Sequence, residues 1–194
     1  ELLQLLDYPL AAPSANPFGY ISPTTPEHVR DQLGEKIEFI LDGGPCEVGL
    51  ESTIVGFDQN QFKIYRKGGV PIELLEEFLN EKIEISTGEN MPGSLKSHYA
   101  PRVPLVIGNP EDWTNHPDIQ NIGVISFKKT YPFIDEKLQF VLSPSGDLIE
   151  AARNLFAAMR SLDQLKPLQI IAEVFPEEGL GAAINDRLQR AATS

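Results

Sequence analysis

One long amphipathic pattern stands among several short apolar runs in the second half of the sequence. Residues 146–162 place apolar side chains at helical spacing, and Ser145 occupies the position of an N-terminal cap. A second helical pattern covers residues 181–191. Runs with the length and composition of strands lie at 105–107, 122–127, 140–142 and 168–175. Because strands and helices alternate, this half of the chain is expected to form a small open α/β unit.

The first part of the chain, residues 1–85, also mixes helical and strand patterns. Thr25-Pro26-Glu27 combines a hydroxyl cap, a proline at the first helical position and an acid in the first turn, so a helix is expected from there to Gly34. A second short amphipathic helix is expected at 71–79. Strands are expected at 37–41, 52–57 and 62–65, the last two joined by a turn at Asp58-Gln59-Asn60.

Residues 86–102 separate these two parts and have the composition of a linker. Ser, Thr, Gly, Asn and Pro are frequent there, so little regular structure is expected. His98 and Tyr99 are unusual in a plain spacer, since an aromatic and an ionisable side chain can contact a ligand. We therefore predict that the segment is a lid over a site. The expected units are 1–85, 86–102 and 103–194.

The bulk composition narrows the function classes. The net charge is −12, with 28 acidic and 16 basic residues, which disfavours unaided binding to a nucleic-acid backbone. No apolar run approaches the roughly 20 residues that span a bilayer, so no membrane association is expected. The single cysteine, Cys46, fits a reducing cytoplasm, and we interpret it as a small buried side chain rather than a nucleophile. No metal-ligand spacing occurs in the sequence.

Small hydroxyl and glycine residues recur in blocks between residues 13 and 69. Short hydroxyls and exposed backbone N–H groups hold phosphate and carboxylate oxygens without steric bulk. Arg66 follows the last strand of the first part and supplies a cation with a fork geometry for such anions. The sequence therefore predicts an anion-binding site. The blocks are Pro13-Ser14-Ala15-Asn16, Ser22-Pro23-Thr24-Thr25, 43–53 and Tyr65-Arg66-Lys67-Gly68-Gly69.

Together with two further motifs, these blocks resemble the long, two-domain form of the L-threonylcarbamoyladenylate synthase family. The further motifs are Pro92-Gly93 with His98-Tyr99-Ala100-Pro101, and the tail Gly179-Leu180-Gly181-Ala182-Ala183-Ile184-Asn185-Asp186-Arg187-Leu188. The resemblance covers essentially the whole chain. It implies the C-terminal part of a YrdC-like twisted α/β sheet domain, followed by a small Rossmann-like open α/β domain. The family's N-terminal half of the catalytic domain does not precede Glu1, so the chain alone is expected to be inactive.

The resemblance also implies an activity. Members of the family join L-threonine, bicarbonate and ATP into L-threonylcarbamoyladenylate and release pyrophosphate, and Mg²⁺ is expected to arrive with ATP. The expected partners are these substrates, the N-terminal half of the catalytic domain, and the machinery that transfers the threonylcarbamoyl group to tRNA. Two alternatives remain open: an RNA-binding YrdC-like module, and a carbamoyl-transfer domain of the hydrogenase-maturation type.

Site residues follow from the same resemblance. Contacts with ATP are implied for Ser14, Ser22, Arg66 and Tyr99, and contacts with threonine for Ala12 and Ser52. No residue is assigned a catalytic proton transfer or a metal. Each assignment has a purely structural alternative: a turn, a cap or a strand hydroxyl for the serines, a surface ion pair for Arg66, and packing between domains for Tyr99.

Overall fold

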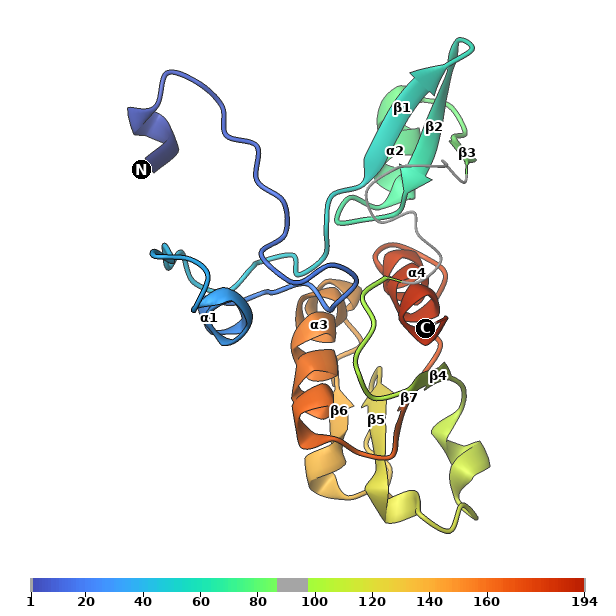
Figure 1. The fold of residues 1–194 in the computed structure, drawn as a ribbon. Helices are drawn as coiled ribbons and strands as arrows, with labels where there is room; N and C mark the ends of the chain where they lie inside the picture. Colours follow the sequence, from blue (N-terminus) through green and yellow to red (C-terminus); the bar gives the residue numbers. More distant parts are fainter. Residues whose placement is uncertain (1, 87–97, 194) are drawn as a thin grey trace.

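The computed structural model describes residues 2–86 and 98–193, and it is a mixed α/β protein with two separate sheets (Figure 1). The first sheet lies at residues 54–85 and the second at 105–172. The stretch 87–97, which belongs to the segment expected to be a lid, lies outside the described residues. Within the described ranges, no helix combines the length and apolar character needed to cross a bilayer.

The first sheet is a hairpin with a short third strand. Strands β1 (Ile54–Asp58) and β2 (Gln61–Arg66) pair antiparallel, and both turn residues, Gln59 and Asn60, have positive φ. Such a turn matches the twist of the two strands. Helix α2 (Ile72–Leu79) then leads to β3 (Glu84–Ile85), which pairs parallel to β2. The hairpin and α2 confirm the sequence expectation; β3 has only two residues and carries no readable pattern.

The N-terminal segment contains little regular structure. A 3₁₀ turn, η1 (Leu2–Leu5), precedes a long coil, and α1 (Pro26–Leu33) follows. The hydroxyl of Thr25 caps α1 by accepting a hydrogen bond from the His28 N–H, as its sequence predicts.

The strand expected at 37–41 is wrong. These residues are coil, and the side chains of Phe39 and Leu41 are 87% and 79% exposed. Alternating apolar residues form a strand only where a neighbouring strand supplies hydrogen bonds, and no strand in the described ranges pairs with this segment.

The second sheet has four parallel strands in the order β4-β7-β5-β6. Its strands are β4 (Leu105–Ile107), β5 (Ile122–Ser126), β6 (Gln139–Val141) and β7 (Gln169–Ala172). The connections contain the 3₁₀ turns η2 (Pro110–Trp113), η3 (Ile119–Asn121) and η4 (Glu136–Leu138). Helix α3 (Leu148–Leu165) links β6 to β7, and α4 (Gly181–Ala192) closes the chain.

Both faces of this sheet are buried. Alternate residues such as Ile125 and Ile170 pack with α3 and α4, whereas Ile122 and Ile171 pack on the opposite face, under the connections that carry the 3₁₀ turns. This burial on both faces explains why β5 reads as a continuous apolar run.

Two local expectations need correction. Helix α3 is capped by Asp147, whose carboxylate accepts a hydrogen bond from the Ile149 N–H at 2.7 Å, and not by Ser145. Residue 146 is a glycine with φ +81°, so the helix starts only after this turn. Cys46 is exposed rather than buried, because the loop around it lies at the surface and is held through a bond from the Cys46 N–H to the Thr24 carbonyl.

The first part of the chain packs onto the second through α3. The fully buried Ile21 belongs to the same core as Leu155 on α3. Arg160 on α3 donates hydrogen bonds to the carbonyls of Ile21 and Ser22. Each bond satisfies a buried backbone carbonyl, so this contact fixes the course of the chain next to Ser22.

Candidate functional site

The structure brings Ser52 and Arg66 together at the end of the β1–β2 hairpin. The Arg66 Nε and Nη2 atoms lie 3.1 and 2.9 Å from the Ser52 carbonyl oxygen, and Nη2 also lies 3.3 Å from the Ser52 hydroxyl. Two nitrogens of the guanidinium thus donate hydrogen bonds to the same backbone carbonyl oxygen. Residues that the resemblance implied for two different substrates are therefore direct neighbours.

Glycines behind Arg66 allow this approach. A Cβ atom on Gly68 would stand 2.4 Å from the backbone of Ser52 and Thr53, so only glycine fits there. The Gly69 N–H donates to the Glu51 carbonyl at 2.8 Å. This N–H is thus already used within the protein, where it holds two chain segments together.

Ser22 stands in a second cluster. Its side chain is buried, and its hydroxyl donates to the Glu51 carboxylate, with 2.6 Å between Ser22 Oγ and Glu51 Oε1. The other carboxylate oxygen accepts a hydrogen bond from Arg187 Nε at 2.9 Å. Arg187 lies on α4 and its side chain is 0% exposed. A hydroxyl from the first part and a guanidinium from the second are thus joined by one carboxylate.

Charge pairing governs the ionisation of Glu51. Burial alone would raise its pKa, but the nearby charge of Arg187 and the hydrogen bonds from Ser22 and Arg187 lower the pKa below its usual value. Glu51 is therefore a carboxylate at neutral pH and only accepts hydrogen bonds.

Tyr99 adjoins this cluster and is 1% exposed. Its ring stacks on Phe156 with 5.5 Å between ring centroids, and the Arg187 guanidinium lies 5.1 Å from the ring centroid. The Tyr99 backbone has φ +66°, a conformation that is unfavourable for a bulky side chain. A contact between this buried ring and a nucleotide requires the segment around it to move.

The two neighbours of Tyr99 are tied to other parts of the chain. The His98 N–H donates to the Arg190 carbonyl, and the Ala100 N–H donates to the Gly19 carbonyl at 2.9 Å. Burial lowers the pKa of His98, so its ring is neutral at neutral pH.

Ala12 and Ser14 belong to the coil in the N-terminal part of the chain. Both are exposed on the coil that precedes Ile21, and the Ser14 carbonyl accepts a hydrogen bond from the Asn16 N–H at 3.0 Å. In Figure 1 this coil runs away from the rest of the chain toward η1. The exposed turn leaves the Ser14 hydroxyl accessible to a ligand.

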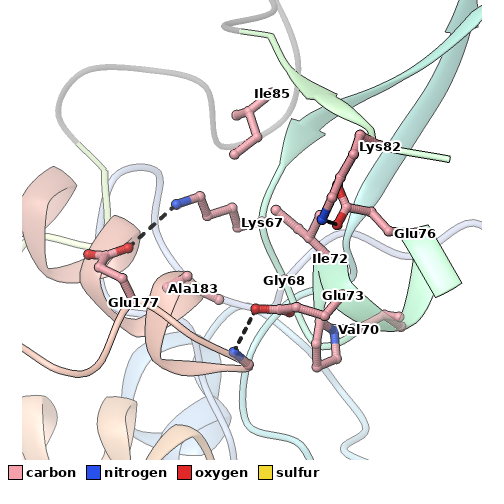
Figure 2. A pocket seen from close by; sticks show the side chains of 13 residues that line it. Lys67, Gly68, Val70, Ile72, Glu73, Glu76, Lys82, Ile85, Glu177 and Ala183 are labelled. Carbon is pink, nitrogen blue, oxygen red and sulfur yellow. Dashed lines mark hydrogen bonds and ion pairs between the residues drawn. The ribbon is translucent and has the colours of Figure 1, made fainter.

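A cavity of about 290 Å³ lies where the first part meets α4 (Figure 2). Two contacts close its sides: Lys67 pairs with Glu177 at 3.8 Å, and the Gly179 N–H donates to Glu73 at 3.1 Å. Its lining also includes Glu76 and Lys82, which pair with each other. Three carboxylates against two ammonium groups disfavour an anion, so this cavity is a poor match for a phosphate site.

No group of three or more His, Cys, Asp or Glu side chains in the described part of the chain could hold a metal ion.

Glu51 and Arg187 are the polar residues of this region that the sequence pattern did not assign. Both occur inside the motifs that carried the resemblance, Glu51 beside Ser52 and Arg187 in the tail. No local signal distinguished them, because Glu51 has the polar Ser52 as a neighbour and Arg187 follows Asp186, so neither residue stands out as a charge within an apolar run.

Comparisons with known proteins agree with these motifs. Residues 70–193 match the family model described as "Threonylcarbamoyl-AMP synthase, C-terminal domain", and residues 1–68 match the one described as "Telomere recombination". The chain is 34% identical to the threonylcarbamoyl-AMP synthase of Pyrococcus abyssi, over 98% of the chain and 60% of that protein. It is 34% identical to the one of Bacillus subtilis, over 95% of the chain and 57% of that protein.

A solved structure is similar as well. The crystal structure of P. abyssi Sua5 complexed with L-threonine matches with a TM-score of 0.79 and 33% identity. The match covers 93% of this chain and 56% of that one. The chain thus spans between half and two thirds of the length of the relatives and of the solved structure.

Proposed function

The chain belongs to the threonylcarbamoyl-AMP synthase family, and on this premise we propose that it takes part in the synthesis of L-threonylcarbamoyladenylate from L-threonine, bicarbonate and ATP. The amine of threonine and bicarbonate form a carbamate and water. A carbamate oxygen then attacks the α-phosphorus of ATP, the new P–O bond forms, and the bond to pyrophosphate breaks. The product feeds the threonylcarbamoyl modification of tRNA in the cytoplasm, through a separate transfer machinery.

The contact between Arg66 and Ser52 carries this proposal. The attack joins the two substrates, so residues that hold threonine and the phosphates must be adjacent, and Arg66 Nη2 lies 2.9 Å from the Ser52 carbonyl oxygen. The guanidinium offsets the charge that develops as pyrophosphate leaves. We propose that Ser14, Ser22, Arg66 and Tyr99 contact ATP, and that Ala12 and Ser52 contact threonine. Mg²⁺ enters with the nucleotide and is held by its phosphates.

Exposed apolar side chains support the proposal that residues 1–68 act together with further catalytic-domain sequence, of the kind the longer relatives have. Leu5, Phe18, Phe39 and Leu41 are each at least 79% exposed, and large apolar side chains left in solvent favour contact with another protein segment.

For residues 103–194 we infer a small Rossmann-like domain, preceded by a catalytic part at 1–85 and a connecting segment at 86–102. Four parallel strands with a crossover helix between β6 and β7 support this inference.

The test measures pyrophosphate release and detects the adenylate by mass spectrometry, with the complete polypeptide that carries this sequence and with residues 1–194 alone. We expect release from the complete polypeptide only when threonine, bicarbonate and ATP are all present. Release that does not need threonine would overturn the substrate assignment. Full activity of residues 1–194 alone would overturn the requirement for further catalytic-domain sequence.

A further inference from the structure

The hydroxyl of Ser22 has a single proton, and in the structure this proton is donated to the Glu51 carboxylate. The distance of 2.6 Å between Ser22 Oγ and Glu51 Oε1 is that of a strong hydrogen bond to a carboxylate. Ser22 can therefore donate to a phosphate oxygen only after this bond is broken.

A phosphate at Ser22 also comes close to a negative charge. An oxygen within hydrogen-bond distance of Ser22 Oγ lies no more than about 5.5 Å from Glu51 Oε1. Like charges at this separation repel each other strongly in a partly desolvated site. Something must offset the charge of Glu51 before the nucleotide can bind there.

Arg187 is placed to do so. Its Nε donates to Glu51 Oε2 at 2.9 Å, on the side of the carboxylate that Ser22 does not use. Its Nη1 pairs with Asp186 at 2.7 Å, whereas Nη2 is buried and has no hydrogen-bond partner among the residues that the structure describes. A fully buried guanidinium with an unsatisfied NH2 group costs folding free energy, which favours a functional role for this residue.

We propose that Arg187 is a positioning residue for ATP, an inference that rests on the proposed function. Arg187 acts through Glu51: it orients and neutralises that carboxylate, so that the Ser22 hydroxyl can donate its hydrogen bond to a phosphate group instead. The second domain thereby contributes to nucleotide binding without touching the nucleotide. Helix α4, which carries Arg187, and the loop that carries Glu51 are 136 residues apart in sequence and meet at this contact.

The test compares three variants of the complete polypeptide in the pyrophosphate-release assay. Arg187→Gln leaves Glu51 charged and unneutralised, so the KM for ATP should rise at least tenfold while the KM for threonine changes less than threefold. Glu51→Gln removes the repelling charge, so the KM for ATP should not rise more than threefold. The double variant Glu51→Gln with Arg187→Gln should return the KM for ATP to within threefold of wild type.

The rescue shows that Arg187 acts through the charge of Glu51, and the selective change in the KM for ATP separates positioning from plain structural support, because a loss of fold would raise the KM for threonine as well. An unrescued KM for ATP, or an equal rise in the KM for threonine, would overturn the inference. If Arg187→Gln does not fold, Arg187→Lys replaces it: it keeps the charge, and its KM for ATP should rise less than tenfold. A larger rise in Arg187→Lys, or a rise above threefold in Glu51→Gln, would equally overturn the inference.

Arg102→Gln is the matched control. Arg102 pairs with the buried Asp163 at 2.9 Å and joins the end of the connecting segment to α3, but it does not contact Glu51 or Ser22. Its KM for ATP should stay within twofold of wild type. A wild-type polypeptide without threonine-dependent release overturns the proposed function itself, whereas an active wild type with an unchanged KM for ATP in Arg187→Gln overturns only the role of Arg187.

Discussion

The guanidinium of Arg66 lies 2.9 Å from the backbone carbonyl oxygen of Ser52, which fixes the end of strand β2 to a residue two positions before strand β1. The contact depends on Gly68, because any side chain at that position would collide with the backbone of Ser52 and Thr53. Two residues proposed for different substrates are thus held at one place by the backbone itself.

Removal of Arg66 should impair the reaction at the step that expels pyrophosphate. For Arg66→Ala we expect kcat/KM for pyrophosphate release to fall at least tenfold, which corresponds to about 1.4 kcal/mol of transition-state stabilisation. Lys63→Ala on the same strand is the control: Lys63 pairs with the exposed Asp58, and this variant should change kcat/KM less than twofold. Equal losses in the two variants would contradict a specific role for Arg66.

Gly49 should tolerate no side chain. Its φ is +78°, and a Cβ atom there would stand 2.5 Å from the Arg153 Cα on α3. We expect Gly49→Ala to lower the free energy of unfolding by at least about 1 kcal/mol, from backbone strain and displacement of the loop.

Gly43→Ala is the matched control for this loop, because a Cβ atom at residue 43 would meet nothing within 4 Å and the φ angle there is not in the left-handed region. Its free energy of unfolding should stay within about 1 kcal/mol of wild type. Urea unfolding followed by circular dichroism measures both values. Equal free energies of unfolding for Gly49→Ala and Gly43→Ala would show that the loop does not pack against α3 at Gly49.

Phe156 should be one of the main stabilising residues of the shared core. It is 0% exposed, lies on α3 and stacks on Tyr99. Phe156→Ala should reduce the free energy of unfolding by about 3–5 kcal/mol, through lost burial and the cavity that remains. Leu165→Ala on the same helix, where the side chain is 50% exposed, should cost much less. Chemical denaturation of both variants provides the comparison.

Asp163 should make stability sensitive to acid. Burial raises the pKa of its carboxyl, but hydrogen bonds from the Tyr20 hydroxyl, the Val103 N–H and Arg102 outweigh burial and lower the pKa. The carboxyl group therefore contributes stability above its unfolded pKa of about 3.9, and this contribution is lost as pH falls through the lowered folded value. Asp163→Asn should be less stable than wild type at pH 7, and the difference should shrink below about pH 4.

Urea unfolding at pH 7, 5, 4 and 3 measures this difference for wild type and Asp163→Asn. The remaining acid sensitivity of the variant comes from other carboxylates, so only the change in the difference is diagnostic. A difference that stays constant from pH 7 to pH 3 would show that the Asp163 carboxylate does not stabilise the fold through its charge.

The sequence by itself determined those elements that arise from interactions between near neighbours. The stripe on α3 and the cap of α1 depend on residues within four positions of each other, and the β1–β2 hairpin on two strand patterns joined by a short turn, so local patterns revealed them. The motifs also placed Ser22, Ser52 and Arg66 in one family pattern. Where local patterns were misleading, at 37–41, apolar alternation existed without a partner strand.

Only the tertiary structure decided which distant groups meet. Ser22, Glu51 and Arg187 come from three segments, and no periodicity links a hydroxyl to a guanidinium 165 positions further on. The same holds for Gly68: position 68 must be a glycine because a side chain there would collide with the backbone of Ser52. A buried charge must find a partner wherever the fold brings one close, so the pairing of Glu51 with Arg187 became visible only once α4 packed against the first part of the chain.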